Sequence, residues 1–127
     1  PDYFDHANEE VLCILMMETV EGVECIEQIA KLPGVDGYYI GPTDLAISMG
    51  LPPKIDAPYP RHVEAVQHVI DVAKAHGQNA GIHVTGPEEG LRRWEQGFNL
   101  NPICNDIWLL AAGIDRHIAE FKAGLAG

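Results

Sequence analysis

The sequence is poor in basic residues and has no long apolar run. Eight lysines and arginines stand against nineteen aspartates and glutamates, which gives a formal net charge of −11. Phosphate backbones and anionic lipids repel a surface this acidic, so we expect no nucleic-acid partner and no membrane partner. No apolar run approaches the roughly 20 residues that a membrane-spanning helix needs. These features predict a soluble, cytoplasmic protein.

Cysteines are few, and the commonest catalytic motifs are absent. The three cysteines, Cys13, Cys25 and Cys104, contain no CxxC pair and cannot all form disulfides within one chain. This favours a reducing compartment and three buried, unreactive thiols. The sequence contains no GxGxxG, GxxxxGK[ST], GxSxG or HExxH pattern. It therefore carries no signature of the common nucleotide-binding and hydrolase sites.

The length sets the domain organisation. With 127 residues, 46% of them hydrophobic, the chain is long enough for one packed domain and too short for two. We therefore treat residues 1–127 as a single unit. The first residue is Pro1 rather than Met, and we expect the sequence to begin inside a longer protein.

Apolar runs and amphipathic segments alternate along the chain. Strands are predicted at 11–17, 35–41, 80–84 and 98–104. Amphipathic helices are predicted between and after them, at about 20–31, 63–76, 87–96 and 114–125. A proline-rich loop is predicted at 50–60. This order predicts an α/β fold with a parallel sheet and right-handed crossovers.

Acidic and polar residues follow the predicted strands. Glu18 comes directly after the first strand, and Asp44 lies shortly after the second. His83 lies late in the third strand, and Asn105 and Asp106 follow the fourth. Ligands of parallel sheets bind beyond the carboxyl ends of the strands, and neighbouring strands are about 4.8 Å apart. Glu18 and Asp44 are therefore expected to bind one hard cation, Mg²⁺ or Mn²⁺ rather than Zn²⁺.

Each of these residues also has a structural interpretation. Glu18 would equally form a salt bridge or contact the N-terminus of the following helix, and Asp44 would stabilise a turn after Pro42. A histidine in a β-branched strand, such as His83, is more often a hydrogen-bonded interior residue than a ligand. The turn itself would expose the backbone N–H groups of Thr43 and Asp44 to a small carboxylate.

The segments LMMET and VDGYYIGPTDLAISMG resemble the second half of the HpcH/HpaI aldolase/citrate lyase family. These are metal-dependent 2-oxo-acid aldolases of the phosphoenolpyruvate/pyruvate superfamily. The most specific part is GPTDL, with Asp36-Gly37 upstream and Met49-Gly50 downstream. NEEVLCILMMET, AGIHVTG and the closing helix extend the resemblance over essentially the whole chain.

The resemblance implies a (β/α)₈ TIM barrel, which takes about 250 residues. This chain would supply strands five to eight and their helices, the C-terminal half. In the family, the counterparts of Glu18 and Asp44 bind a divalent metal, for which we expect Mg²⁺, with Mn²⁺ or Co²⁺ as alternatives. The resemblance and the strand-end positions together predict the substrate-binding residues. These are Gly41, Pro42, Thr43, Asp44 and His83.

The implied chemistry is that of a class II aldolase. The metal would chelate the carboxylate and 2-oxo group of pyruvate and stabilise its enolate as a Lewis acid. The expected substrate is a 4-hydroxy-2-oxo acid, and the expected small-molecule partners are pyruvate and an aldehyde. Alternatives are a citrate-lyase-like or CoA-ester lyase, and a non-catalytic half-barrel that binds carboxylates or associates with other subunits.

The sequence departs from the family pattern in several places. Met16 replaces a glutamine two residues before the metal-binding glutamate, Asn105 replaces a small residue, and His83 replaces an aliphatic one. The family's catalytic histidine and substrate-binding arginine lie in the first half of the barrel. These 127 residues therefore offer no general base, and the isolated chain is predicted to be inactive. The open strand edges of a half-barrel also predict a homo-oligomer, with dimerisation, swapping or aggregation of the isolated chain.

Overall fold

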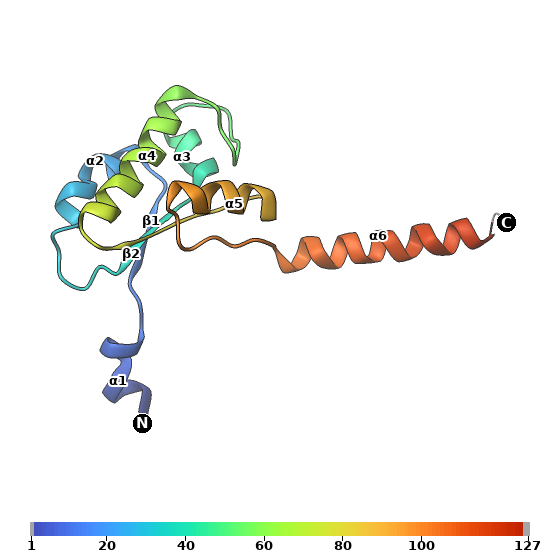
Figure 1. Ribbon diagram of the computed structural model, residues 1–127, viewed down its shortest axis with the longest axis horizontal. Coiled ribbons are helices and arrows are strands. Elements are labelled where there is room, and N and C mark those ends of the chain that lie inside the picture. The colour runs from blue at the N-terminus through green and yellow to red at the C-terminus, as the bar shows by residue number, and fades with distance from the viewer. Residues whose placement is uncertain (1, 126–127) are drawn as a thin grey trace.

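The computed structural model describes residues 2–125, which form three strands and six helices (Figure 1). The elements are α1 (Asp2–Glu10), β1 (Ile14–Met17), α2 (Val20–Ile29), β2 (Gly37–Ile40), α3 (Pro42–Ser48), α4 (Pro60–Ala75), β3 (Asn79–Ile82), α5 (Pro87–Gln96) and α6 (Asp106–Leu125). The alternation of strands and helices confirms the predicted α/β class.

The three strands form one parallel sheet in the order β1-β2-β3. Met17 pairs with Ile40, and Ile40 pairs with Ile82, so the three strands end at the same edge of the sheet. All three side chains are buried. Since side chains alternate along a strand, the residues one position earlier, including Met16 and Tyr39, lie on the opposite face.

Helices α2 and α4 pack against each other and cover the buried face of the sheet. Ile26 of α2 and Val69 of α4 are fully buried beside Ile40 of β2. Each such side chain contributes about 1.5–3 kcal/mol to folding by leaving water. The 3.6-residue spacing of the apolar residues in both helices is what allows one face of each helix to join this core.

The first strand is shorter than predicted. Residues 11–13 lie outside β1, and Val11 and Leu12 are exposed. The ladder begins only at Ile14 because the Asp36 side chain, rather than a backbone carbonyl, accepts the Cys13 N–H at 2.7 Å, and the Val11 N–H donates to the Ala7 carbonyl of the preceding helix. The preceding residues form α1, which the sequence analysis did not predict.

The predicted strand at 98–104 is wrong. This segment makes one isolated bridge, between Gly81 and Leu100. Beside it, the Asn99 side chain rather than a backbone carbonyl accepts the Ala80 N–H, at 3.1 Å. Pro102 has no N–H to continue the ladder.

The last helix begins earlier than predicted, at Asp106, and none of its residues in the described chain is buried. Figure 1 shows α6 extending away from the sheet and its helices.

The prediction of buried cysteines is also wrong, because Cys13, Cys25 and Cys104 are all exposed. They precede β1, lie on the outer surface of α2 and precede α6, respectively, outside the packed face of the sheet. No helix within residues 2–125 is both long enough and apolar enough to cross a membrane.

Candidate functional site

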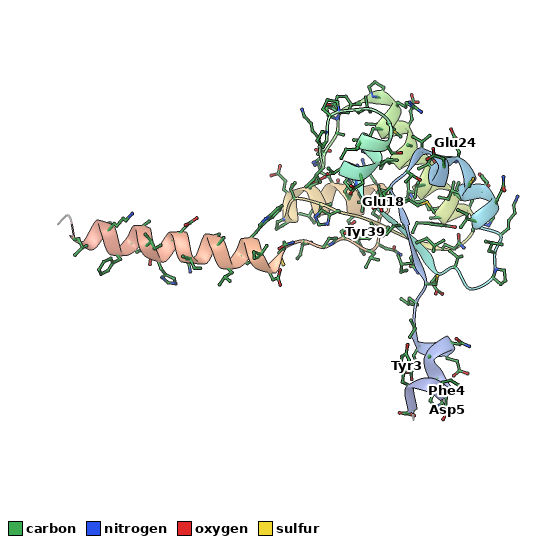
Figure 2. The ribbon with its side chains drawn as sticks, turned by 180° about the vertical axis from the view of Figure 1, so that it is seen from behind. Tyr3, Phe4, Asp5, Glu18, Glu24 and Tyr39 are labelled. Carbon is green, nitrogen blue, oxygen red and sulfur yellow. The ribbon has the colours of Figure 1, made fainter. Side chains whose placement is uncertain are left out.

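Glu18 lies at the edge of the sheet where β1 and β2 both end. The pairing of Met17 with Ile40 places Glu18 opposite Gly41, the next residue of each strand. The Glu18 side chain is half-buried and packs directly against Gly41. Figure 2 shows Glu18 in the body formed by the sheet and its helices, away from α1 and α6. A Cβ atom at Gly41 would lie 2.7 Å from Glu18 Oε2 and 3.2 Å from Glu18 Cβ. Because Gly41 has a negative φ of −90°, the need for glycine here is one of space rather than of backbone conformation.

Asp44 lies in the first turn of α3, directly beyond β2. Pro42 occupies the first position of this helix, where its missing N–H costs nothing. The N–H groups of Thr43 and Asp44 follow, and first-turn N–H groups have no partner within their own helix. The exposed Asp44 carboxylate and these N–H groups therefore lie at the same edge of the sheet as Glu18. The turn predicted for this segment is the start of a short helix.

A cavity of about 210 Å³ joins this edge to the open face of the sheet. Its lining contains all five residues predicted to bind substrate, together with two that the sequence analysis did not select. The lining residues are Met16, Tyr39, Gly41, Pro42, Thr43, Asp44 and His83. Glu18 is outside this lining but lies next to Gly41, which belongs to it.

Tyr39 is a site residue that sequence reasoning missed. Its hydroxyl lies 3.2 Å from His83 Nδ1, and both residues line the cavity. Partial burial raises the pKa of Tyr39 above its ordinary value, so its hydroxyl stays protonated near neutral pH. The sequence did contain a signal for Tyr39. Its position in the predicted strand places its side chain on the same face of the sheet as that of Met16.

His62 is a second residue without a predicted role. It is 1% exposed, and its Nε2 lies 2.9 Å from the Pro42 carbonyl oxygen, so it links α4 to the start of α3. Burial lowers the pKa of His62, partly offset by this hydrogen bond, which favours the neutral ring with Nε2–H as the donor. The signal in the sequence was its spacing of four residues from Val66, which places it on the apolar face of α4.

Two other candidates do not reach the site. Asn105 and Asp106 follow the segment that was predicted to be a strand, and their side chains instead accept the Ile107 N–H, at 3.1 Å and 2.8 Å. They therefore cap the N-terminus of α6.

The donor set at the sheet edge suits a hard cation. Within residues 2–125, no cluster of three or more His, Cys, Asp or Glu residues could hold a metal. Two carboxylates are nevertheless the set with which proteins hold Mg²⁺ when substrate and water supply the other ligands. The space left at Gly41 accommodates the Glu18 carboxylate, and Asp44 follows in the first turn of α3.

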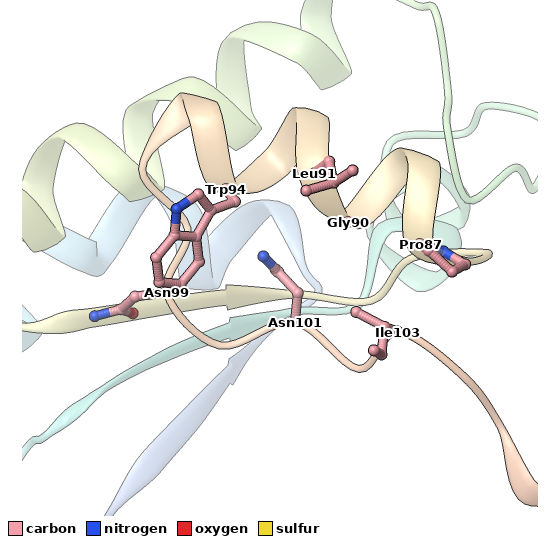
Figure 3. A pocket seen from close by; sticks show the side chains of 7 residues that line it. All are labelled: Pro87, Gly90, Leu91, Trp94, Asn99, Asn101 and Ile103. Carbon is pink, nitrogen blue, oxygen red and sulfur yellow. The ribbon is translucent and has the colours of Figure 1, made fainter.

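A separate cavity of about 420 Å³ lies between α5 and residues 99–103 (Figure 3). Leu91 and Trp94 of α5 form one side, and Asn101 and Ile103 lie across from them. None of its lining residues ionises. This cavity offers an apolar contact surface rather than a site for chemistry.

Comparison with known proteins identifies the family. The model of the HpcH/HpaI aldolase/citrate lyase family matches residues 2–99. The chain belongs to this family. The match covers both strand ends of the site, Glu18 and the segment 41–44.

Curated members of the HpcH/HpaI family are named as aldolases. The 5-keto-4-deoxy-D-glucarate aldolase of Salmonella arizonae is 34% identical over 122 residues, which cover 96% of this chain and 47% of that protein. The hydroxypyruvate/pyruvate aldolase of Rhizorhabdus wittichii is 33% identical over 121 residues, covering 95% and 48%. The chain thus spans about half the length of the curated relatives it matches.

Solved structures share the fold of this chain. An HpcH/HpaI aldolase/citrate lyase family protein from Burkholderia cenocepacia superposes with a TM-score of 0.84 at 30% identity, over 95% of this chain and 46% of that one. The citrate synthase SbnG superposes with a TM-score of 0.81 at 28% identity, over 99% and 51%.

Proposed function

We propose that this chain forms the metal-binding and carboxylate-binding half of a class II aldolase site. In this proposal the three strands are part of a (β/α)₈ barrel, and the chain corresponds to its C-terminal half. The family membership and the names of the relatives support a carbon–carbon lyase. The substrate is a 4-hydroxy-2-oxo acid that yields pyruvate and an aldehyde.

The carboxylates of Glu18 and Asp44 would hold the divalent cation, with Mg²⁺ preferred over Mn²⁺ or Co²⁺. When bound, this cation supplies Lewis-acid stabilisation of the pyruvate enolate. The N–H groups of Thr43 and Asp44 would donate to the carboxylate of the 2-oxo acid, as first-turn amides do for anions. The ring of Pro42 is buried, and it fixes the start of the helix that presents these groups.

The observation that carries the proposal is the contact between Glu18 and Gly41. Gly41 has no side chain that would displace the carboxylate, and its own chain continues directly into the turn that carries Asp44. Two acidic groups on neighbouring strand ends repel each other, and a positive charge between them would offset that repulsion. A shared cation provides that charge.

Isothermal titration with MgCl₂, followed by pyruvate, tests the proposal on this chain. We expect Mg²⁺ binding that Glu18→Gln combined with Asp44→Asn abolishes, and pyruvate binding that depends on Mg²⁺. The matched control is Glu95→Gln combined with Asp115→Asn, which removes the same charge from the exposed faces of α5 and α6. Equal Mg²⁺ affinity in the wild type and the site variant would refute the site.

Catalysis by the 127 residues alone is a separate question. We expect no release of pyruvate from a 4-hydroxy-2-oxo acid, because the resemblance places the general base in the other half of the barrel. Turnover at a rate above that of the Glu18→Gln/Asp44→Asn variant would show that this chain carries a base of its own.

A further inference from the structure

His62 is a buried polar residue that no step of the proposed function uses. It lies in the first turn of α4 and is 1% exposed, and its Nε2 is 2.9 Å from the Pro42 carbonyl oxygen. A carbonyl oxygen only accepts hydrogen bonds, so Nε2 carries a hydrogen and donates it. An apolar side chain would pack at this position without the cost of burying an imidazole. The hydrogen bond is therefore the property that requires a donor here.

The carbonyl that His62 contacts belongs to the same peptide unit as the Thr43 N–H. The described residues contain no cis peptide bond, so this carbonyl and this N–H point in opposite directions within one rigid plane. By fixing the carbonyl, His62 also fixes the direction of the Thr43 N–H, which points away from His62. Thr43 itself lines the cavity at the strand ends. A hydrogen bond to the carbonyl also polarises the peptide and strengthens its N–H as a donor.

The rest of α3 is held in place by other contacts. Leu45 and Ala46 in its middle are fully buried. At its end, the Ser48 hydroxyl oxygen accepts the Val20 N–H at 3.0 Å and so connects α3 to the start of α2. Loss of the His62 hydrogen bond should therefore free the first peptide of α3 without displacing the helix.

We propose that His62 is a positioning residue, which holds the Pro42–Thr43 peptide in the orientation that lets the Thr43 N–H donate to the carboxylate of the 2-oxo acid. This inference rests on the proposed function, which assigns that N–H to the carboxylate. His62 does not touch the ligand in this account. It acts from α4, behind the segment that lines the cavity, through the Pro42 carbonyl.

Two replacements of His62 test the proposal. His62→Gln keeps an N–H near the place of Nε2, and His62→Leu removes the donor. The control is Val69→Ala, which opens space in the core at a fully buried position of the same helix and should lower stability. Pyruvate binding to the Mg²⁺-saturated chain is measured by ¹H–¹⁵N NMR titration. We expect His62→Leu to bind pyruvate about fivefold to tenfold more weakly, and His62→Gln and Val69→Ala to stay within about twofold of the wild type.

The ¹⁵N chemical shift of Thr43 reports the same hydrogen bond without a ligand, because it responds to polarisation of the preceding carbonyl. It should change in His62→Leu and stay near the wild-type value in His62→Gln and Val69→Ala. Long-range ¹H–¹⁵N spectra of the wild-type imidazole should show the hydrogen on Nε2. A hydrogen on Nδ1 alone would overturn the inference whether or not the variants fold.

The outcomes separate this inference from the proposed function. Mg²⁺ affinity should be within about twofold of the wild type in His62→Leu, because side-chain carboxylates rather than this peptide hold the cation. Pyruvate affinity that is unchanged in His62→Leu, or that falls equally in His62→Gln or in Val69→Ala, overturns the role of His62 alone. If the wild type binds no pyruvate in the presence of Mg²⁺, the proposed function fails and this inference fails with it.

Discussion

At the scale of the residue, the site depends on where side chains are absent as much as on where they are present. Gly41 leaves room for the Glu18 carboxylate, and Gly81 leaves room for the Tyr39 ring. Both glycines are buried in or beside the sheet, where a glycine weakens a strand and therefore indicates a close approach of other atoms. Both close approaches lie beside the cavity of the proposed site.

Gly41→Ala should weaken metal binding without unfolding the chain. The added methyl group would displace Glu18 Oε2, while the φ of −90° is one that alanine adopts freely. We expect Mn²⁺ affinity, measured by electron paramagnetic resonance, to fall about tenfold, which corresponds to about 1.4 kcal/mol. Gly113→Ala is the control, because nothing lies within 4 Å of a Cβ atom there. Unchanged affinity in Gly41→Ala would show that the position of Glu18 does not matter for the cation.

His62 should make the stability of the chain depend on pH. Burial lowers its pKa in the folded state below the ordinary value of 6.5, so the unfolded chain binds a proton at a higher pH than the folded one. The contribution of neutral His62 to the free energy of unfolding is therefore complete above pH 6.5. It is lost as the pH falls from 6.5 toward the pKa that His62 has in the folded chain. Urea unfolding at pH 7.5 and 5.5 should show a smaller loss of stability in His62→Gln, which keeps an N–H donor for Pro42, than in the wild type. Equal losses in the two proteins would contradict this assignment.

At the scale of the element, the strand ends and helix caps position the site. Thr19 caps α2 by accepting the Gly22 N–H at 3.0 Å, which fixes the turn that contains Glu18. After β3, the buried Glu89 of α5 accepts both the N–H and the hydroxyl of Thr85, each at 2.8 Å. Glu89 also lies 3.7 Å from Arg93, which contacts Asp56 in the loop before α4. These contacts connect the segment after His83 to α5 and, through Arg93, to the loop before α4.

Glu89→Ala should therefore be strongly destabilising. It leaves the N–H and the hydroxyl of Thr85 without their acceptor and removes one of the two carboxylates beside Arg93, which costs about 2–4 kcal/mol. Glu88→Ala removes the same charge from the same helix turn at an exposed position, and should change stability by less than about 0.5 kcal/mol. Urea denaturation of both variants measures the difference. Similar losses of unfolding free energy in the two variants would mean that Glu89 stabilises the chain only through its charge near the N-terminus of the helix.

Local pattern was sufficient to predict β1 to β3 and the helices α2, α4 and α5. It also placed Pro87 at the start of α5 and Gly97 after its end. The secondary-structure predictions are wrong where the conformation of a segment depends on contacts with residues distant in the sequence. Residues 98–104 are as apolar as a strand, but Asn99 and Pro102 break the pairing with β3. Similarly, the strand-end rule selected Glu18 and Asp44. It missed Tyr39, whose ring enters the cavity beside Gly81 of β3, and His62, which contacts Pro42 from α4.

At the scale of the whole molecule, much apolar surface remains uncovered. In α6, six exposed side chains form one stripe along the helix: Ile107, Leu110, Ile114, Ile118, Phe121 and Leu125. The helix extends away from the body that carries the site, and the apolar cavity beside Trp94 is also open (Figures 1 and 3). Exposed apolar surface of this kind favours association. We expect a second copy of the chain to cover it.

Light scattering should therefore detect dimers or larger species of this chain. Ile114→Lys combined with Ile118→Lys adds charge to the stripe and should shift the population toward monomers. The control, Ala112→Lys combined with Ala119→Lys, adds the same charge to the opposite face of α6 and should leave the association intact. A wild-type chain that remains a stable monomer would contradict the prediction.

The location of bound Mn²⁺ on the chain tests the shared cation most directly. Substoichiometric Mn²⁺ broadens the ¹H–¹⁵N NMR signals of nearby amides, and excess Mg²⁺ should reverse the effect by competition. The account predicts that the signals of Thr19, Gly41 and Thr43 broaden first, and that Glu18→Gln combined with Asp44→Asn removes this broadening. With a net charge of −11, the alternative is diffuse binding to acidic surface. Broadening that begins elsewhere, on α6 for example, and persists in the double variant would contradict the account.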